Sequence, residues 1–101
     1  MADSNPLIHL VVKDKNGLIH EDDVRAVTSY NEKGIFDILP MHTNFISLIK
    51  DKIIIHGRSG EDKKIDLRVG LVKVDDNQVH IYLGLPEPIE PENSDIATLK
   101  S

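Results

Sequence analysis

Residues 71–83, Leu-Val-Lys-Val-Asp-Asp-Asn-Gln-Val-His-Ile-Tyr-Leu, carry the clearest structural signal in this sequence. The second half of the stretch, 79–83, alternates Val, Ile and Leu with His and Tyr, which is the period-two pattern of a strand that buries one face. Residues 71–74 have the same extended character, and the polar residues 75–78 between the two runs suit a tight connection. The stretch therefore predicts an antiparallel β-hairpin.

Similar short runs recur along the rest of the chain, separated by turn residues. Asn16-Gly17 tolerates the positive φ of a tight turn, and residues 31–34 form a polar break. No helical periodicity extends over about ten residues before position 85. Further extended segments are expected at residues 7–14, 18–20, 24–30, 35–39, 45–49, 53–56 and 65–69. With the hairpin above, they predict an all-β fold, a two-layer antiparallel β-sandwich of about eight to ten short strands.

Proline residues mark the limits of this regular pattern. Pro40 has no N–H to donate to a strand ladder, so residues 40–44 are expected to form a corner between strands. After Gly84 the composition changes, because prolines alternate with glutamates. We therefore expect one β-sandwich domain over residues 1–85 and an acidic, Pro-rich tail over residues 86–101, disordered or weakly helical.

Composition narrows the classes of partner. The net charge is −5 and aromatic residues make up 4% of the chain, so neither phosphate-backbone binding nor base stacking is favoured, and no nucleic acid is expected. The absence of Cys removes disulfides and thiolate metal sites, which makes a reducing, cytoplasmic location the default. No apolar run approaches the roughly 18 residues that span a bilayer, so direct membrane insertion is not expected.

Candidate catalytic and ligand-binding groups are few. The sequence contains five histidines: His9, His20, His42, His56 and His80. No two of them have the spacing of a metal-ligand pair. The acidic stretch 20–23 is interpreted as a solvated turn rather than a cation site, and residues 57–60 as a hairpin loop rather than an anion site. Since no nucleophile with a base and an oxyanion hole stands out, neither an enzyme nor a cofactor-binding protein is expected.

The stretch 34–42, Gly-Ile-Phe-Asp-Ile-Leu-Pro-Met-His, resembles the signature of the epsilon subunit of F-type ATP synthases. In that family a Gly, an apolar pair, a Leu or Tyr, Pro, a small residue and His recur in this order. Further segments are similar to the family's first strands and to its last two: 10–12, 17–18, 24–27, 68–74 and 77–81. The resemblance covers residues 7–84, and its β-sandwich fold agrees with the fold predicted above.

The resemblance implies the N-terminal β-sandwich domain of a rotor subunit in the central stalk. Such a subunit docks on the gamma subunit and on the polar loops of the c-ring, and couples ion flow to ATP synthesis without catalysing a reaction. It is expected to be monomeric when isolated and, in the complex, peripheral to the inner face of the cell membrane. Residues 86–101 do not resemble the inhibitory helical hairpin with which the family commonly continues. The alternative is a free-standing β-sandwich interaction module unrelated to ATP synthase.

The resemblance also suggests contact residues. The predicted c-ring contacts are Met41, His42, Thr43 and Asn44 at the corner, with exposed Ile35 expected beside them. The family's usual corner is Gly-His-Ala-Pro, so only His42 matches it directly. Position 35 is often acidic in the family, and at Ile35 an apolar contact can replace the charged one. Val11 and Val27, which are apolar residues on otherwise polar strand faces, are the predicted gamma-side contacts.

Overall fold

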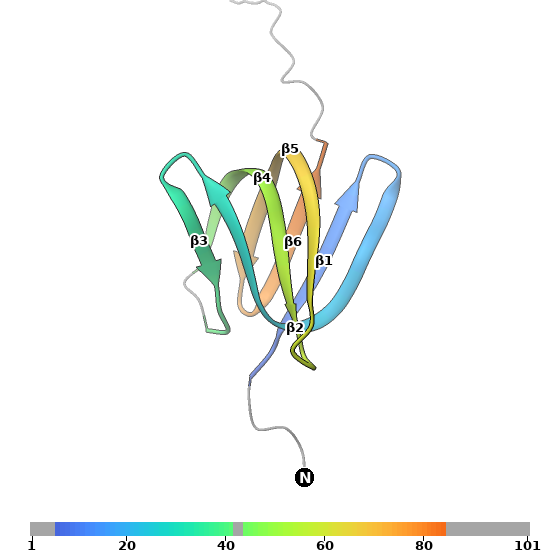
Figure 1. Cartoon of the computed structure of the whole chain (residues 1–101), viewed down its shortest axis with the longest axis vertical. Coiled ribbons are helices and arrows are strands. Elements are labelled where there is room, and N and C mark those ends of the chain that lie inside the picture. The colour runs from blue at the N-terminus through green and yellow to red at the C-terminus, as the bar shows by residue number, and fades with distance from the viewer. Residues whose placement is uncertain (1–5, 42–43, 85–101) are drawn as a thin grey trace, which may run out of the picture.

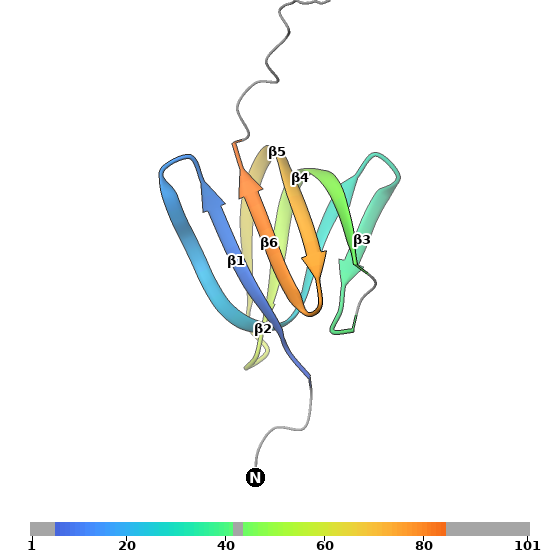
Figure 2. The same ribbon diagram turned by 180° about the vertical axis from the view of Figure 1, so that it is seen from behind.

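The computed structural model of the chain describes residues 6–41 and 44–84, and its regular elements there are all strands. The six strands are β1 (Ile8–Asp14), β2 (Gly17–Asn31), β3 (Gly34–Ile38), β4 (Phe45–Gly57), β5 (Asp62–Asp75) and β6 (Gln78–Leu83). They form one sheet in the order β1-β6-β5-β4-β2-β3, and an additional pairing of β1 with β2 closes it into a flattened barrel with two layers (Figures 1 and 2).

Three long strands pass from one layer to the other, which explains the number of strands. The first half of β2 pairs with β1, whereas its second half pairs with β4 and β3. β4 and β5 pair with each other along their whole length and bend together, as Figure 1 shows. The predicted all-β sandwich is confirmed. The described residues form six strands instead of about eight to ten short ones, because several predicted segments are halves of one bent strand.

Irregularities in the ladders coincide with the bends. The β4–β5 register shifts between Lys50 and Asp51, and Asp51 has a φ of 73°. The β2–β4 register shifts twice, once on each side of Ala26 to Thr28. At the second shift, Ser29 Oγ donates a hydrogen bond of 2.9 Å to the backbone oxygen of Lys52. Bulges increase local twist and bend a strand, so these positions allow the long strands to change layer.

Two details of the sequence prediction are wrong. Residues 20–23 were expected in a solvated turn, but they lie within β2 and pair with β1, because the ladder continues through the acidic stretch. The sandwich is also not antiparallel throughout, since β1 and β6 pair in parallel. β3 and β4 are both antiparallel to β2, so the connection between them does not reverse the chain, and the four reversals at the other connections leave the first and last strands pointing the same way.

The core fills the space between the two layers with aliphatic side chains. Its buried members are Ile8, Leu10, Val12, Val24, Val27, Ile38, Ile49, Ile53, Ile55, Val72, Val74, Val79 and Ile81. Phe36 and Phe45 pack against this cluster, and their two rings contact each other edge to face with centroids 5.9 Å apart. Aromatic residues make up only 4% of the chain, so the core consists mainly of Ile, Leu and Val, and burial of that apolar surface is the main stabilising term for the fold.

Side chains and backbone geometry define the turns that the sequence predicted. Gly17 and Gly34 have φ values of 122° and 118°, in the region that favours glycine, where β2 and β3 begin. Between β5 and β6, Asp76 and Asn77 have φ values of 54° and 65°, as both central residues of a type I′ hairpin turn require. The Gly57–Gly60 stretch is a hairpin loop, as predicted, closed by a bond from the Gly60 amide to the Gly57 oxygen.

Gly70 marks a close approach at the bend of β5 and leads to the first prediction. A Cβ at this position would lie 2.8 Å from the backbone oxygen of Tyr82 and 2.9 Å from Leu67 Cδ1. Gly70→Ala is therefore expected to lower the free energy of unfolding by about 1–3 kcal/mol through overpacking. The measurement is urea denaturation followed by circular dichroism.

Gly57→Ala is the matched control for this prediction. The atoms nearest to a Cβ at position 57 belong to the end of the exposed Glu61 side chain, which can rotate away. Its effect is expected to stay within about 1 kcal/mol in either direction. Equal losses in the two variants would show that the contact with β6 does not constrain position 70.

Candidate docking surfaces

The predicted corner is present, and the neighbouring β5–β6 turn holds it. The Met41 amide donates a hydrogen bond of 2.7 Å to Asn77 Oδ1, and the Asp76 amide donates one of 3.0 Å to Asn44 Oδ1. Met41 has a φ of 68°, and 79% of its surface is exposed. The corner therefore presents Met41 to solvent on a backbone that is already hydrogen-bonded. His42 and Thr43 lie outside the described residues.

Ile35 does not lie beside this corner. It follows the β2–β3 turn and pairs with Tyr30, whereas the corner follows the other end of β3, and Figure 1 shows β3 separating the two. Because a strand rises by about 3.3 Å per residue, the five residues of β3 hold the two predicted contacts at opposite ends of that strand, roughly 15 Å apart. Ile35 is nevertheless 63% exposed, as a contact residue should be.

The two valines predicted on a partner-facing surface are both buried. Val27 is fully buried in the core cluster, because the bulges in β2 turn its side chain towards Ile38 and Ile55, the residues with which it pairs. Val11 is on the outer side of β1 but only 7% exposed. Val27 is thus excluded as a surface contact of the folded domain, and Val11 offers little area.

The apolar surface that the sequence analysis missed lies on the outer side of β4, β5 and β6. Leu48 pairs with Leu71, and Leu71 pairs with Tyr82, so these three side chains form a row across the strands. Ile46 lies two residues before Leu48 on the same side of β4. We call these four residues the β4–β5–β6 face. Ile46 and Leu48 are 62% and 59% exposed, which is unusual for two large apolar side chains on one strand face.

A shallow groove runs beside this face. It is lined by residues of the β2–β3 turn, by residues 45–50 of β4 and by Val69, and its volume is about 550 Å³. Ile46 and Leu48 supply apolar walls, while Lys33 and Lys50 supply positive charge. The sequence contained a signal for this surface. Residues 45–49 are apolar at both odd and even positions, whereas a strand that packs on the core through one face needs apolar residues at alternate positions only.

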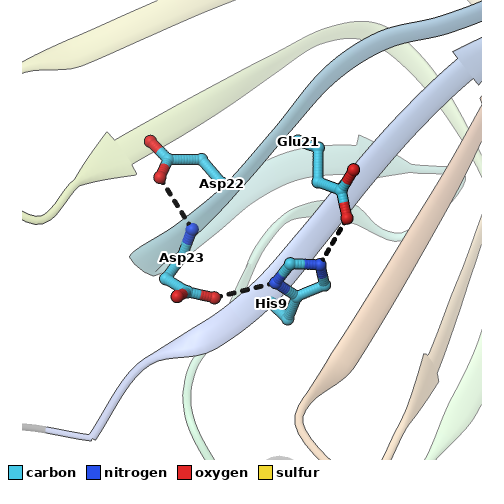
Figure 3. A network of polar contacts seen from close by, with 4 residues as sticks. All are labelled: His9, Glu21, Asp22 and Asp23. Atoms are coloured by element: carbon cyan, nitrogen blue, oxygen red, sulfur yellow. Dashed lines mark hydrogen bonds and ion pairs between the residues drawn. The ribbon is translucent and has the colours of Figure 1, made fainter.

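Polar side chains gather on the outer sides of both layers at β2. His9 Nε2 lies 2.7 Å from Glu21 Oε2, and His9 Nδ1 lies 2.8 Å from Asp23 Oδ1 (Figure 3). Hydrogen bonds with Asp23 first and Glu21 second raise the pKa of His9 above its ordinary value. The sequence alone does not bring these residues together, because their pairing depends on the register of β1 and β2.

A second polar row crosses four strands in the other layer. His56 Nδ1 lies 2.9 Å from Asp62 Oδ1, and His56 Nε2 lies 2.8 Å from Thr28 Oγ1. Thr28 Oγ1 in turn donates a hydrogen bond of 2.5 Å to Asp37 Oδ1. Within residues 6–41 and 44–84, no three acidic, His or Cys side chains are arranged to hold a metal ion, and no helix is long and apolar enough to cross a membrane.

Comparison with known proteins identifies the family. The family model described as the β-sandwich domain of the ATP synthase delta/epsilon chain matches residues 7–83. The chain belongs to this family. The ATP synthase epsilon chain of Sulfurovum sp. (strain NBC37-1) is 30% identical over 92 residues, which are 90% of this chain and 72% of that relative. The epsilon chain of a Nitratiruptor species is 33% identical, with 82% and 65% of the two chains aligned.

Solved structures agree with the assignment to the delta/epsilon family at the level of the fold. A chain in the mitochondrial ATP synthase of Euglena gracilis, in a structure of OSCP, F1 and c-ring, matches with a TM-score of 0.73 at 20% identity over 88% of this chain and 56% of that one. A chain in the central stalk and c-ring of the Tetrahymena thermophila enzyme matches with a TM-score of 0.65 at 16% identity, over 90% and 80%. This chain spans roughly two thirds of the curated epsilon chains that it matches.

The corner yields the second prediction. Asn77→Gly keeps a residue suited to a φ of 65° but removes the side-chain oxygen that accepts the Met41 amide. Loss of this hydrogen bond, about 0.5–1.5 kcal/mol, is expected to speed hydrogen exchange of the Met41 amide roughly two- to tenfold, as NMR can measure. The Asp76 amide, which donates to Asn44, is the internal control, and Asn77→Asp should preserve protection at Met41. Unchanged exchange at Met41 in Asn77→Gly would contradict the role of Asn77.

Proposed function

We propose that this chain is a central-stalk subunit of an F-type ATP synthase, which docks on the gamma subunit and on the c-ring and takes part in coupling ion flow to ATP synthesis. The proposal rests on membership of the delta/epsilon family and on the exposed β4–β5–β6 face, which is the observation that carries the docking role. The subunit transmits force and has no catalytic step. It works at the cytoplasmic face of the membrane, bound through its partners.

The gamma subunit is proposed to bind the β4–β5–β6 face. An apolar row formed by Leu48, Leu71 and Tyr82 is suited to the dry centre of an interface, in which aromatic and large aliphatic side chains are enriched. Lys33 and Lys50 at the adjoining groove suit the polar rim. These side chains are carried on paired strands, so docking orders little backbone and loses little free energy to ordering.

The c-ring is proposed to contact the end of the molecule that carries Ile35. This position is commonly acidic in the family, and its side chain projects from β3 next to the β2–β3 turn. The corner with Met41 and Asn44 is the alternative contact, because it is also exposed and held by hydrogen bonds. The two ends are far enough apart for one variant at each end to distinguish between them.

The third prediction tests both contacts with reciprocal variants. Leu48→Asp places a charge in the proposed gamma interface and is expected to weaken binding to the gamma subunit of the same organism at least tenfold, or about 1.4 kcal/mol. Ile35 is about as exposed as Leu48 in the free chain. Ile35→Lys, which introduces the charge opposite to the acidic residue common at this position, should leave gamma binding unchanged while weakening binding to purified c-ring. Isothermal titration calorimetry and co-sedimentation with c-ring in detergent give the two affinities.

The remaining outcomes separate the alternatives. If Met41→Asp weakens ring binding and Ile35→Lys does not, the ring contact belongs to the corner. If the folded wild-type chain binds neither gamma nor the ring, the rotor role is wrong, and a free-standing β-sandwich interaction module takes its place. Circular dichroism and the urea midpoint of each variant confirm that the loss of binding does not reflect loss of folding.

A further inference from the structure

We propose that the attachment of β2 to the domain depends on protonation. Each half of this strand is held by a histidine whose hydrogen bonds are complete only when both of its ring nitrogens carry protons. His9 fastens the first half of β2, and His56 fastens the second half. The device lies outside the docking surfaces described above and does not depend on the rotor function. It follows from an inventory of donors and acceptors.

His9 lies between two carboxylates of β2, as Figure 3 shows. Glu21 Oε2 is 2.7 Å from Nε2 and Asp23 Oδ1 is 2.8 Å from Nδ1. An ionised carboxylate can only accept hydrogen bonds, so each ring nitrogen must donate, and only the imidazolium form does so. When the ring loses one proton, a nitrogen lone pair faces a carboxylate oxygen at this distance, and one of the two contacts must open.

The surroundings of His9 favour the charged ring. On β2, Asp22 lies between the two partners, and its side chain accepts the Asp23 amide at 2.8 Å, which orders the acidic stretch. On β6, the directly paired residue is the uncharged Gln78. The other charged or titratable groups on this side are Lys13 of β1, His80 of β6, and Lys73 and Asp75 of β5, and Asp76 is in the turn whose Asn77 oxygen accepts the His9 amide. The carboxylates nearest the ring thus outnumber the cations.

The hydrogen bonds of His56, in the other layer, also require both ring protons. Its Nδ1 must donate to the carboxylate of Asp62, and Thr28 Oγ1 uses its only proton in the bond to Asp37. Nε2 of His56 can therefore bond to Thr28 only by donating to the hydroxyl oxygen, which again requires both ring protons. When the His56 ring is neutral, Thr28 can keep its hydrogen bond with Asp37 or with His56, but not both. The row of hydrogen bonds from β3 to β5 is then interrupted at β2.

The charged groups around His56 have mixed signs. Asp37 of β3 and Asp62 of β5 are the carboxylates of the row, and Arg25 of β2 donates through Nε to the Gly57 oxygen at 3.0 Å. The other charged groups on the same side or in the adjoining hairpin loop are Lys52, Arg58, Glu61, Lys64 and Asp66. Unlike the His9 cluster, this row is partly buried, so its breakage leaves poorly solvated polar atoms.

The first half of β2 is the weaker half. Among the described strand pairings it has one neighbour, β1, and its His20 holds a buried Nε2 with no hydrogen-bond partner in the described part of the chain. An unsatisfied buried polar atom costs free energy in the closed arrangement, and this cost opposes the His9 contacts. Loss of a proton from His9 is therefore expected to loosen the β1–β2 hairpin, which carries the exposed Leu18 and Ile19.

The direction of the pH effect follows from linkage. The folded pKa of His9 is raised above 6.5, so its contribution to stability is fully present below about pH 6.5 and is lost as the pH rises through the raised pKa. The fourth prediction is that the urea midpoint of the chain falls between about pH 6 and about pH 8.5, and that the double variant Glu21→Gln/Asp23→Asn loses most of that fall.

NMR of the wild-type chain tests the geometry without any variant. At about pH 6, both ring nitrogens of His9 should carry protons, and the amide signals of the first half of β2 should change together with that ring as the pH rises. His80→Gln is the matched control, because His80 is on the same side as His9 but stacks on Tyr82, and this variant should keep the wild-type pH response. A neutral His9 at about pH 6, or an unchanged response in the double variant, would overturn the proposal.

Discussion

β2, β4 and β5 each continue unbroken from one layer to the other, and the rest of the structure depends on this continuity. A bent strand keeps its backbone hydrogen bonds in both layers, so the barrel closes without loops through the core. The bends need local irregularity, which Asp51 and the shifts in β2 provide, and they need Gly70, where a side chain would meet the backbone of β6. Closure also decides which side chains face outwards, and therefore where partners can bind.

The sequence predicted the elements that local chemistry defines. Alternation at residues 79–83, the turn at Asn16-Gly17 and the break at Pro40 each depend on neighbouring residues, and each corresponds to a strand, turn or corner of the structure. It did not predict that segments 45–49 and 53–56 form one strand, because a bend and a true interruption look alike when only periodicity is available. The parallel pairing of β1 with β6 is a property of the whole chain and has no local signal.

The contact residues were harder to predict for a related reason. Alternation assigns a residue to one of two faces, but a bulge exchanges the faces, and this is how Val27 enters the core instead of the surface. The position of Ile35 relative to the corner depends on the direction of β3, which brings one to the upper end and the other to the lower end in Figure 1. Leu48 is exposed because the opposite face of its strand already supplies the core residues. This can be recognised only when the positions of both layers are known.

The same continuity links the docking surfaces to the histidine contacts. β2 crosses both layers, so the polar groups that fasten it, at His9 in one layer and at His56 in the other, act on a single strand. The second half of that strand pairs with β3, which carries Ile35, and with β4, which carries Leu48. In the proposed device the response to pH is expected at the β1–β2 edge, where the first half of β2 pairs only with β1 among the described strands. The apolar face is carried by a different pairing, that of Leu48 of β4 with Leu71 of β5, so the proposed docking surface and the proposed proton-dependent edge are separate parts of one sheet.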